Sequence, residues 1–209
     1  MKMKGTIWSY LFKPFRYIAG KESLFVGIGV LLMLSVLGYL TNTNYDGVLD
    51  MHYGCETERL PYGVHALFEL IAWFSLVAVL YPVAKIFSSS SVRPVDMAGT
   101  LAMARFPLVF GALLGLNPGL HTICTKGISL VDEETIASIV QVIEANRSSF
   151  LWAGLFSIPL IIWYIVLLYN AYSVSANLKG ERGGWSFAMG LIISEILAQI
   201  LIHLTAGFL

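Results

Sequence analysis

An arginine, Arg105, lies near the middle of the apolar run 97–116, which is long enough to cross a lipid bilayer. On insertion scales an arginine at mid-depth costs roughly 2.5 kcal/mol as a low estimate, so its side chain should face protein or a wet cavity. This run therefore predicts a membrane-spanning helix packed inside a bundle, with polar partners for Arg105 on neighbouring helices.

The rest of the chain has the composition of an integral membrane protein. Its 209 residues are 57% hydrophobic and 12% charged, with a mean hydropathy of +0.75, whereas a soluble domain carries about 25% charged residues. Lys and Arg balance Asp and Glu at 13 each, so net charge gives no reason to expect a nucleic-acid partner. We predict an all-α polytopic fold with five transmembrane helices, at about 24–41, 64–87, 97–116, 150–172 and 185–209.

Two further helices are expected outside the spans. The leader 1–23 mixes aromatic side chains with Lys13, Arg16 and Lys21, which is typical of an interfacial helix that contacts anionic lipid, and Pro14 should interrupt it. A flexible basic leader is the alternative. In the long connection after the third span, an apolar stripe predicts an amphipathic helix at about 132–146. The remaining chain, 24–209, is predicted to form one membrane domain.

The distribution of Lys and Arg predicts the orientation of the spans. One set of flanks and short loops holds nine of these residues and the other holds three. We therefore expect the N-terminus in the cytoplasm, the C-terminus outside, and the protein in the cytoplasmic (inner) membrane. The nine are Lys2, Lys4, Lys13, Arg16, Lys21, Lys85, Arg93, Lys179 and Arg182, and the three are Arg59, Lys126 and Arg147.

Four charged or imidazole side chains, Glu69, Arg105, Glu195 and His203, lie inside the predicted spans and away from the span ends. Counted at about 1.5 Å per residue from the span ends, Arg105 matches Glu195 in depth and Glu69 matches His203. Glu195, Gln199 and His203 also share one helical face. The prediction is an inner Arg105–Glu195 pair and an outer Glu69–His203 pair. Such a ladder either fixes which helices face each other or serves as the pathway of a small-molecule, ion or proton transporter or channel.

Two His-x-x-Cys pairs lie in the two predicted outer loops. His52 with Cys55, and His121 with Cys124, together offer the two imidazoles and two thiolates of a tetrahedral zinc site. These are the chain's two cysteines, and an extracytoplasmic location also permits a Cys55–Cys124 disulfide. A disulfide, a zinc site and unpaired thiols with coincidental spacing all remain open, and the first two bring the sulfurs together.

Catalytic motifs are not evident in the sequence. There is no phosphate-cradling glycine loop, so nucleotide chemistry is not expected. The acidic run 132–134 is better explained as the first turn of a helix than as part of a catalytic site. We expect a non-enzymatic protein with no resident cofactor, zinc being the one candidate.

Short motifs resemble bacterial members of the Yip family, the Rab-interacting family of five-span membrane proteins. They are Leu-Phe-Lys-Pro-Phe-Arg at 11–16, Arg-Phe-Pro-Leu at 105–108, and the stretch from Trp163 through Tyr-Asn-Ala at 169–171 to Leu-Lys-Gly at 178–180. The resemblance implies a membrane-embedded Yip domain without catalytic residues, which acts by interaction to organise membrane lipids or other membrane proteins, or by self-association.

Eukaryotic relatives in this family are associated with Rab GTPases and vesicle traffic. The cytoplasmic leader of this chain is short, which argues against a GTPase partner. Tyr169, Asn170 and Lys179 are the candidate positions for contact with a partner or lipid, and their alternative role is that of ordinary polar residues at a helix end.

Overall fold

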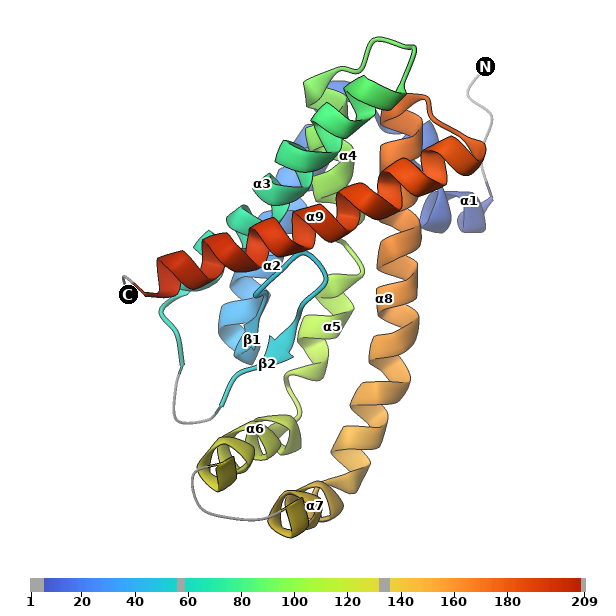
Figure 1. Cartoon of the computed structure of the whole chain (residues 1–209). Coiled ribbons are helices and arrows are strands. Elements are labelled where there is room, and N and C mark those ends of the chain that lie inside the picture. The colour runs from blue at the N-terminus through green and yellow to red at the C-terminus, as the bar shows by residue number, and fades with distance from the viewer. Residues whose placement is uncertain (1–5, 56–58, 132–135, 208–209) are drawn as a thin grey trace.

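The computed structural model describes residues 6–55, 59–131 and 136–207. Helices make up nearly all of the regular structure there, and Figure 1 shows their arrangement. In chain order the elements are α1 (Ile7–Phe12), the short 3-10 helix η1 (Pro14–Arg16), α2 (Gly20–Thr41), β1 (Thr43–Asn44), β2 (His52–Tyr53), α3 (Tyr62–Phe87), α4 (Pro94–Ala104), α5 (Leu108–Leu114), α6 (Pro118–Val131), α7 (Ile136–Ala145), α8 (Arg147–Ala176) and α9 (Gly180–Ala206).

Five helical segments of the described chain are long and apolar enough to cross a membrane, so the predicted all-α polytopic fold is confirmed. They are α2, α3, the pair α4 and α5, α8, and α9. Each lies within a few residues of its predicted range. Hydropathy locates these segments well because hydrocarbon requires about 20 consecutive apolar residues in every spanning helix.

The third of these segments is broken at its middle, where the sequence predicted a continuous helix. Helix α4 ends at Ala104 and α5 begins at Leu108. The intervening turn is closed by tighter bonds, such as that from Leu108 N to Arg105 O at 3.0 Å. Pro107 explains the break, because proline has no N–H to donate and its ring clashes with the preceding helical turn.

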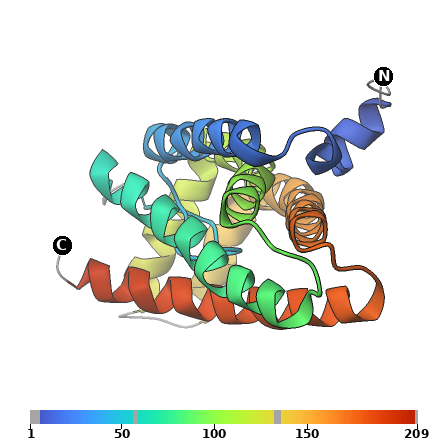
Figure 2. The same cartoon turned by 90° about the horizontal axis from the view of Figure 1, so that it is seen from above.

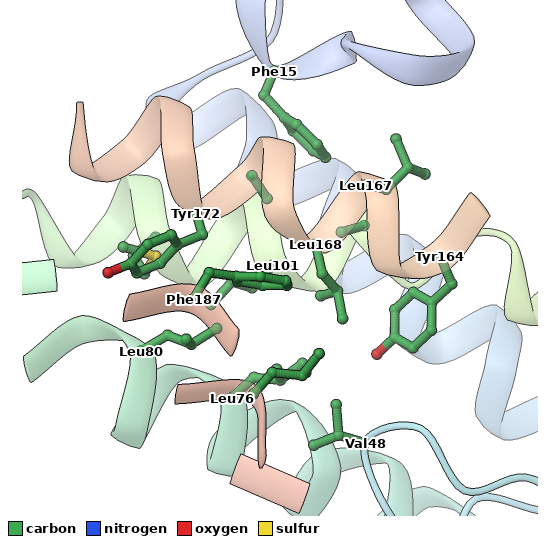
Figure 3. Packing of buried hydrophobic residues seen from close by; sticks show 14 of the residues in the cluster. Phe15, Val48, Leu76, Leu80, Leu101, Tyr164, Leu167, Leu168, Tyr172 and Phe187 are labelled. Atoms are coloured by element: carbon green, nitrogen blue, oxygen red, sulfur yellow. The ribbon is translucent and has the colours of Figure 1, made fainter. Parts of the chain in front are cut away.

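Residues 42–55 form a hairpin that enters the bundle, whereas the sequence suggested a polar outer loop. Strand β1 pairs antiparallel with β2, and the connection between them carries Tyr45 and Val48, each 1% exposed. Val48 belongs to the same buried cluster as Leu76 of α3 and Tyr164 of α8 (Figure 3). Non-helical backbone is tolerated at membrane depth where protein surrounds it, as the helices do here.

Close helix approach depends on glycine at several crossings. A Cβ at Gly27 of α2 would meet Ala102 of α4 at 2.6 Å, and one at Gly190 of α9 would meet Leu80 of α3 at the same distance. Helix α9 lies obliquely across α3, as the views in Figures 1 and 2 agree. The tilt of α9 therefore places its residues at depths that differ from a count along parallel helices.

The N-terminal segment and the long connection between α5 and α8 match their predictions in part. Lys13 separates α1 from η1, which begins at Pro14, so the helix is interrupted where Pro14 predicted. Helix α7 begins at Ile136, and the acidic residues 132–134 lie outside the described residues. The sequence did not predict α6, which precedes α7 in the same connection.

Candidate functional site

A fully buried ion pair joins the second and third spans. The Nε of Arg105 lies 2.7 Å from Oε1 of Glu69, and its Nη2 donates to Oε2 at 2.8 Å. Nη1 donates to the hydroxyl of Tyr164 on α8 at 3.1 Å. The Arg105 side chain is 0% exposed and that of Glu69 is 1% exposed. The cost of burying each charge is offset by the other charge and by two-point hydrogen bonding.

The predicted pairing of Arg105 with Glu195, and of Glu69 with His203, is therefore wrong. Depth was counted as if every span were straight and parallel to its neighbours. The third span is interrupted at Arg105 itself, and α9 crosses the bundle obliquely (Figure 1). His203 is exposed on α9, away from the buried carboxylate of Glu69.

Glu195 instead holds the tip of the hairpin. Its Oε2 accepts a hydrogen bond from the backbone N–H of Leu49 at 2.8 Å, and its Oε1 accepts one from Nε2 of Gln199 at 2.9 Å. The hairpin passes so close that a Cβ at Gly47 would overlap the carboxylate of Glu195. Glycine at this position therefore allows the backbone to approach the carboxylate.

An open groove of about 580 Å³ lies between the hairpin, α3 and α9. This size falls in the range of small-molecule sites. Its polar groups are the carboxylates of Asp46 and Asp50 on the hairpin, with the Gln199 amide and the His203 imidazole on α9. Its wall is apolar, formed by Phe68, Ile200, Ile202, Leu204 and Ala206.

Asp46 is the best-placed acceptor in this groove. Its Oδ2 lies 3.0 Å from Nδ1 of His52, while its Oδ1 is buried without a hydrogen-bond partner among the described residues. The hydrogen bond from His52 to Asp46 raises the pKa of His52, and burial opposes that shift. Protonated His52 therefore neutralises part of the charge of Asp46, and the remaining negative charge comes from Asp50.

A disulfide joins Cys55, at the end of the hairpin, to Cys124 on α6, with 5.0 Å between their Cα atoms. The prediction that the sulfur atoms of Cys55 and Cys124 lie close together is therefore confirmed. The two histidines of those motifs take separate positions. His52 contacts Asp46, and His121 lies between two backbone carbonyl groups.

His121 links the hairpin to the end of α5. Its Nδ1 lies 2.6 Å from the carbonyl oxygen of Gly54, and its Nε2 lies 2.6 Å from that of Gly115. With both nitrogens occupied, His121 is not free to ligate zinc. No group of three or more His, Cys, Asp or Glu side chains in the described residues is arranged to hold a metal ion.

The three positions suggested for partner or lipid contact lie in the second half of α8 and just before α9. Asn170 donates from Nδ2 to the carbonyl oxygen of Phe12 at 2.9 Å, so it anchors the N-terminal segment. Tyr169 packs edge-on against Phe187 of α9, with ring centroids 5.5 Å apart. Lys179 is exposed beside the start of α9. Contact with a partner stays a prediction.

Sequence reasoning missed Asp46 and the inserted hairpin. Two local signals were available: Asp46-Gly47 is a common tight-turn dipeptide, and Val48-Leu49 is an apolar pair within a polar loop.

Gly111 and Gly115 are also explained by the hairpin. A Cβ at Gly111 would meet Met51, and one at Gly115 would meet Thr41 and Thr43. The absence of a side chain at both glycines therefore allows the hairpin to approach closely.

Comparison with known proteins does not identify this chain. No protein-family model matches it, and no curated protein or solved structure is significantly similar to it. The resemblance to the Yip family therefore depends on the short motifs and on the five spans. The groups described above, and not homology, are the basis for inferring function.

Proposed function

We propose that this protein is a non-enzymatic integral membrane protein that binds a small organic cation in the groove between its hairpin and α9. The observation that carries this proposal is the groove itself, where Asp46 and Asp50 face an apolar wall on α3 and α9. Carboxylates attract a cationic headgroup, and the wall accommodates its alkyl part. The carboxylates of Asp46 and Asp50, which line the groove, offer acceptors for an ammonium N–H.

Ligand binding in this groove would affect the position of the hairpin. Gln199 lines the groove and donates to Glu195, which in turn accepts from Leu49 at the hairpin tip. A ligand that engages Gln199 competes with its bond to Glu195. Occupancy is thus coupled to the position of the hairpin through two hydrogen bonds.

The proposed orientation places the N-terminus in the cytoplasm and the groove outside the inner membrane. The end of α3, which carries Lys85, and the start of α9, which Lys179 precedes, lie at the opposite end of the bundle from α6 (Figure 1), and this agrees with the bias of Lys and Arg toward the cytoplasm. The Cys55–Cys124 disulfide supports the same orientation, because disulfides persist in oxidising compartments. The groove shares the hairpin with that disulfide.

Titration of the purified protein with tetraethylammonium and with a linear diamine tests the proposal. Calorimetry should detect saturable binding that is lost in Asp46→Asn and Asp50→Asn. Asp96→Asn is the matched control, because Asp96 lies at the start of α4, pairs with Arg93 and does not line the groove. The cation site would be ruled out if wild type did not bind, or if the two groove variants bound the cation as tightly as wild type.

Transport is the second candidate function, and the broken third span favours it. Discontinuous helices and re-entrant segments occur at the substrate sites of transporters. Here the break carries Arg105, which pairs with Glu69, and the hairpin reaches the same buried cluster. Flux of the same cations into proteoliposomes, abolished by Glu195→Gln, would support transport over binding alone.

The interaction role implied by the Yip resemblance remains a further proposal. In that role the bundle organises lipids or other membrane proteins, and the N-terminal segment held by Asn170 is the element that supports it. Co-purification of one defined membrane-protein partner, lost when that segment is removed, would favour this role. Zinc binding by the outer loops requires reduced cysteines, and metal content tests it.

A further inference from the structure

The N-terminal segment is fastened to α8 through its own backbone. Nε1 of Trp163 donates to the carbonyl oxygen of Leu11 at 3.1 Å, and Nδ2 of Asn170 donates to that of Phe12 at 2.9 Å. Phe15 follows and is 2% exposed within the core cluster. The segment is therefore a fixed part of the bundle, and it extends from Ile7 to the start of α2.

An apolar cavity of about 160 Å³ lies between this segment and the spans. We call it the N-terminal slot. Apolar cavities of about this size accept hydrocarbon groups. The slot is thus suited to part of an acyl chain. Its walls include Leu11 and Pro14 of the segment, Val26 and Val30 of α2, Met103 of α4 and Leu167 of α8.

Basic residues adjoin the slot-lining residues along the chain. Lys13 and Arg16 flank the slot-lining Pro14 along the chain and are both exposed, and Lys21 follows at the start of α2. Residues 1–21 contain no Asp or Glu, and neither Lys13 nor Arg16 has an ion-pair partner among the described residues. Arginine and lysine bind phosphate oxygens well, and polybasic segments favour anionic leaflets.

We propose that the N-terminal slot is a binding site for an anionic phospholipid. Its acyl chain occupies the slot and its phosphate group lies on Lys13 and Arg16. The exposed Ile7 and Trp8 extend the same surface into the surrounding lipid, at 78% and 71% exposure. The site is at a different place from the outer groove, so it stands or falls independently of cation binding.

Competition between two lipids with identical acyl chains tests this site. Delipidated protein is incubated with equal amounts of phosphatidylglycerol and phosphatidylcholine, and bound lipid is counted by native mass spectrometry. At about fivefold for each basic side chain near an anionic headgroup, wild type should prefer phosphatidylglycerol about thirtyfold. Lys13→Gln with Arg16→Gln should bring that preference close to parity, and each single variant should remove about fivefold.

Two further variants separate the site from general surface charge. Lys179→Gln with Arg182→Gln removes two exposed charges from the start of α9 and should leave the preference unchanged. Val26→Phe fills the slot and should lower retention of both lipids. If the Lys179 and Arg182 variant lost as much preference for phosphatidylglycerol as the Lys13 and Arg16 variant, the preference would come from diffuse surface charge. If Val26→Phe retained both lipids fully, no acyl chain would enter the slot. Either result, or no preference in wild type, overturns the proposal.

Discussion

The guanidinium of Arg105 and the carboxylate of Glu69 face each other through two hydrogen bonds, of 2.7 and 2.8 Å, at the centre of the bundle. The pair connects the broken third span to α3. Removing one partner leaves an uncompensated buried charge, which costs far more than the pair itself contributes.

Glu69→Gln should therefore destabilise the protein by about 3 to 5 kcal/mol, the usual cost of an orphaned buried charge. Replacing both partners, as in Arg105→Met with Glu69→Leu, should restore much of that loss. Denaturant unfolding in mixed micelles measures both. Glu195→Gln is the matched control, since its remaining amide oxygen still accepts from Leu49 N, so its cost should be about 1 kcal/mol. Equal losses in Glu69→Gln and Glu195→Gln would instead favour the pairing deduced from depth.

Alanine at the two glycines of α5 and its C-terminal end should have unequal effects. A Cβ at Gly115 would lie 2.8 Å from the backbone carbonyl oxygen of Thr41, so overpacking should cost about 1 to 3 kcal/mol. At Gly111 the nearest atoms belong to the flexible end of Met51, and that side chain can move. Thermal unfolding should therefore show a larger loss for Gly115→Ala.

The same two variants distinguish hairpin packing from dimerisation. Gly111 and Gly115 are four residues apart, a spacing of small residues that allows close helix association in membranes. If they formed a dimer interface, both substitutions would shift the oligomeric state measured by light scattering. We expect no such shift from either one, because both glycines face the hairpin of their own chain.

Protein purified without reductant or chelator should contain neither free thiols nor bound zinc. The disulfide between Cys55 and Cys124 spans 69 residues of sequence, and on the chain-entropy model such a closure stabilises by up to about 4 kcal/mol. Cys55→Ser with Cys124→Ser should lower the unfolding free energy by no more than that amount. One zinc per chain, with thiols reactive only after chelation, would refute the disulfide.

Cation binding in the groove should strengthen as pH rises through the pKa of His52. The hydrogen bond to Asp46 raises that pKa above its ordinary value, so the stabilising contact is complete below the ordinary pKa and is lost above the raised one. Loss of the imidazolium charge leaves Asp46 fully negative, which favours a cationic ligand. Calorimetric titrations between about pH 6 and about pH 9, spanning the ordinary histidine pKa, measure the effect.

His52→Gln is the control for this pH dependence. A glutamine amide keeps a donor near Asp46 without carrying a titrating charge. The variant should bind the cation with little change over the same pH range. A pH profile identical to that of wild type would show that His52 is not the source of the dependence.

Much of this architecture could be read from local sequence. The five spans follow from runs of apolar residues, and the interruption of the N-terminal segment follows from Pro14. Pro107 was an equally local signal for the break after Arg105, although the predicted span ran through it. Arg105 was also recognisable as a buried group that needs a partner, because hydrocarbon excludes an unpaired charge.

The partner of Arg105, the insertion of Val48 and the groove at Asp46 were decided by tertiary structure. Each depends on residues far apart in the chain: Glu69 and Tyr164 around Arg105, and α9 against the hairpin. Hydropathy and residue spacing describe one contiguous segment at a time, so they determine which segments become helices and how long these helices are. Helix tilt, the break in a span and the close approach permitted by glycine determine which side chains meet, because they set distances between elements in three dimensions.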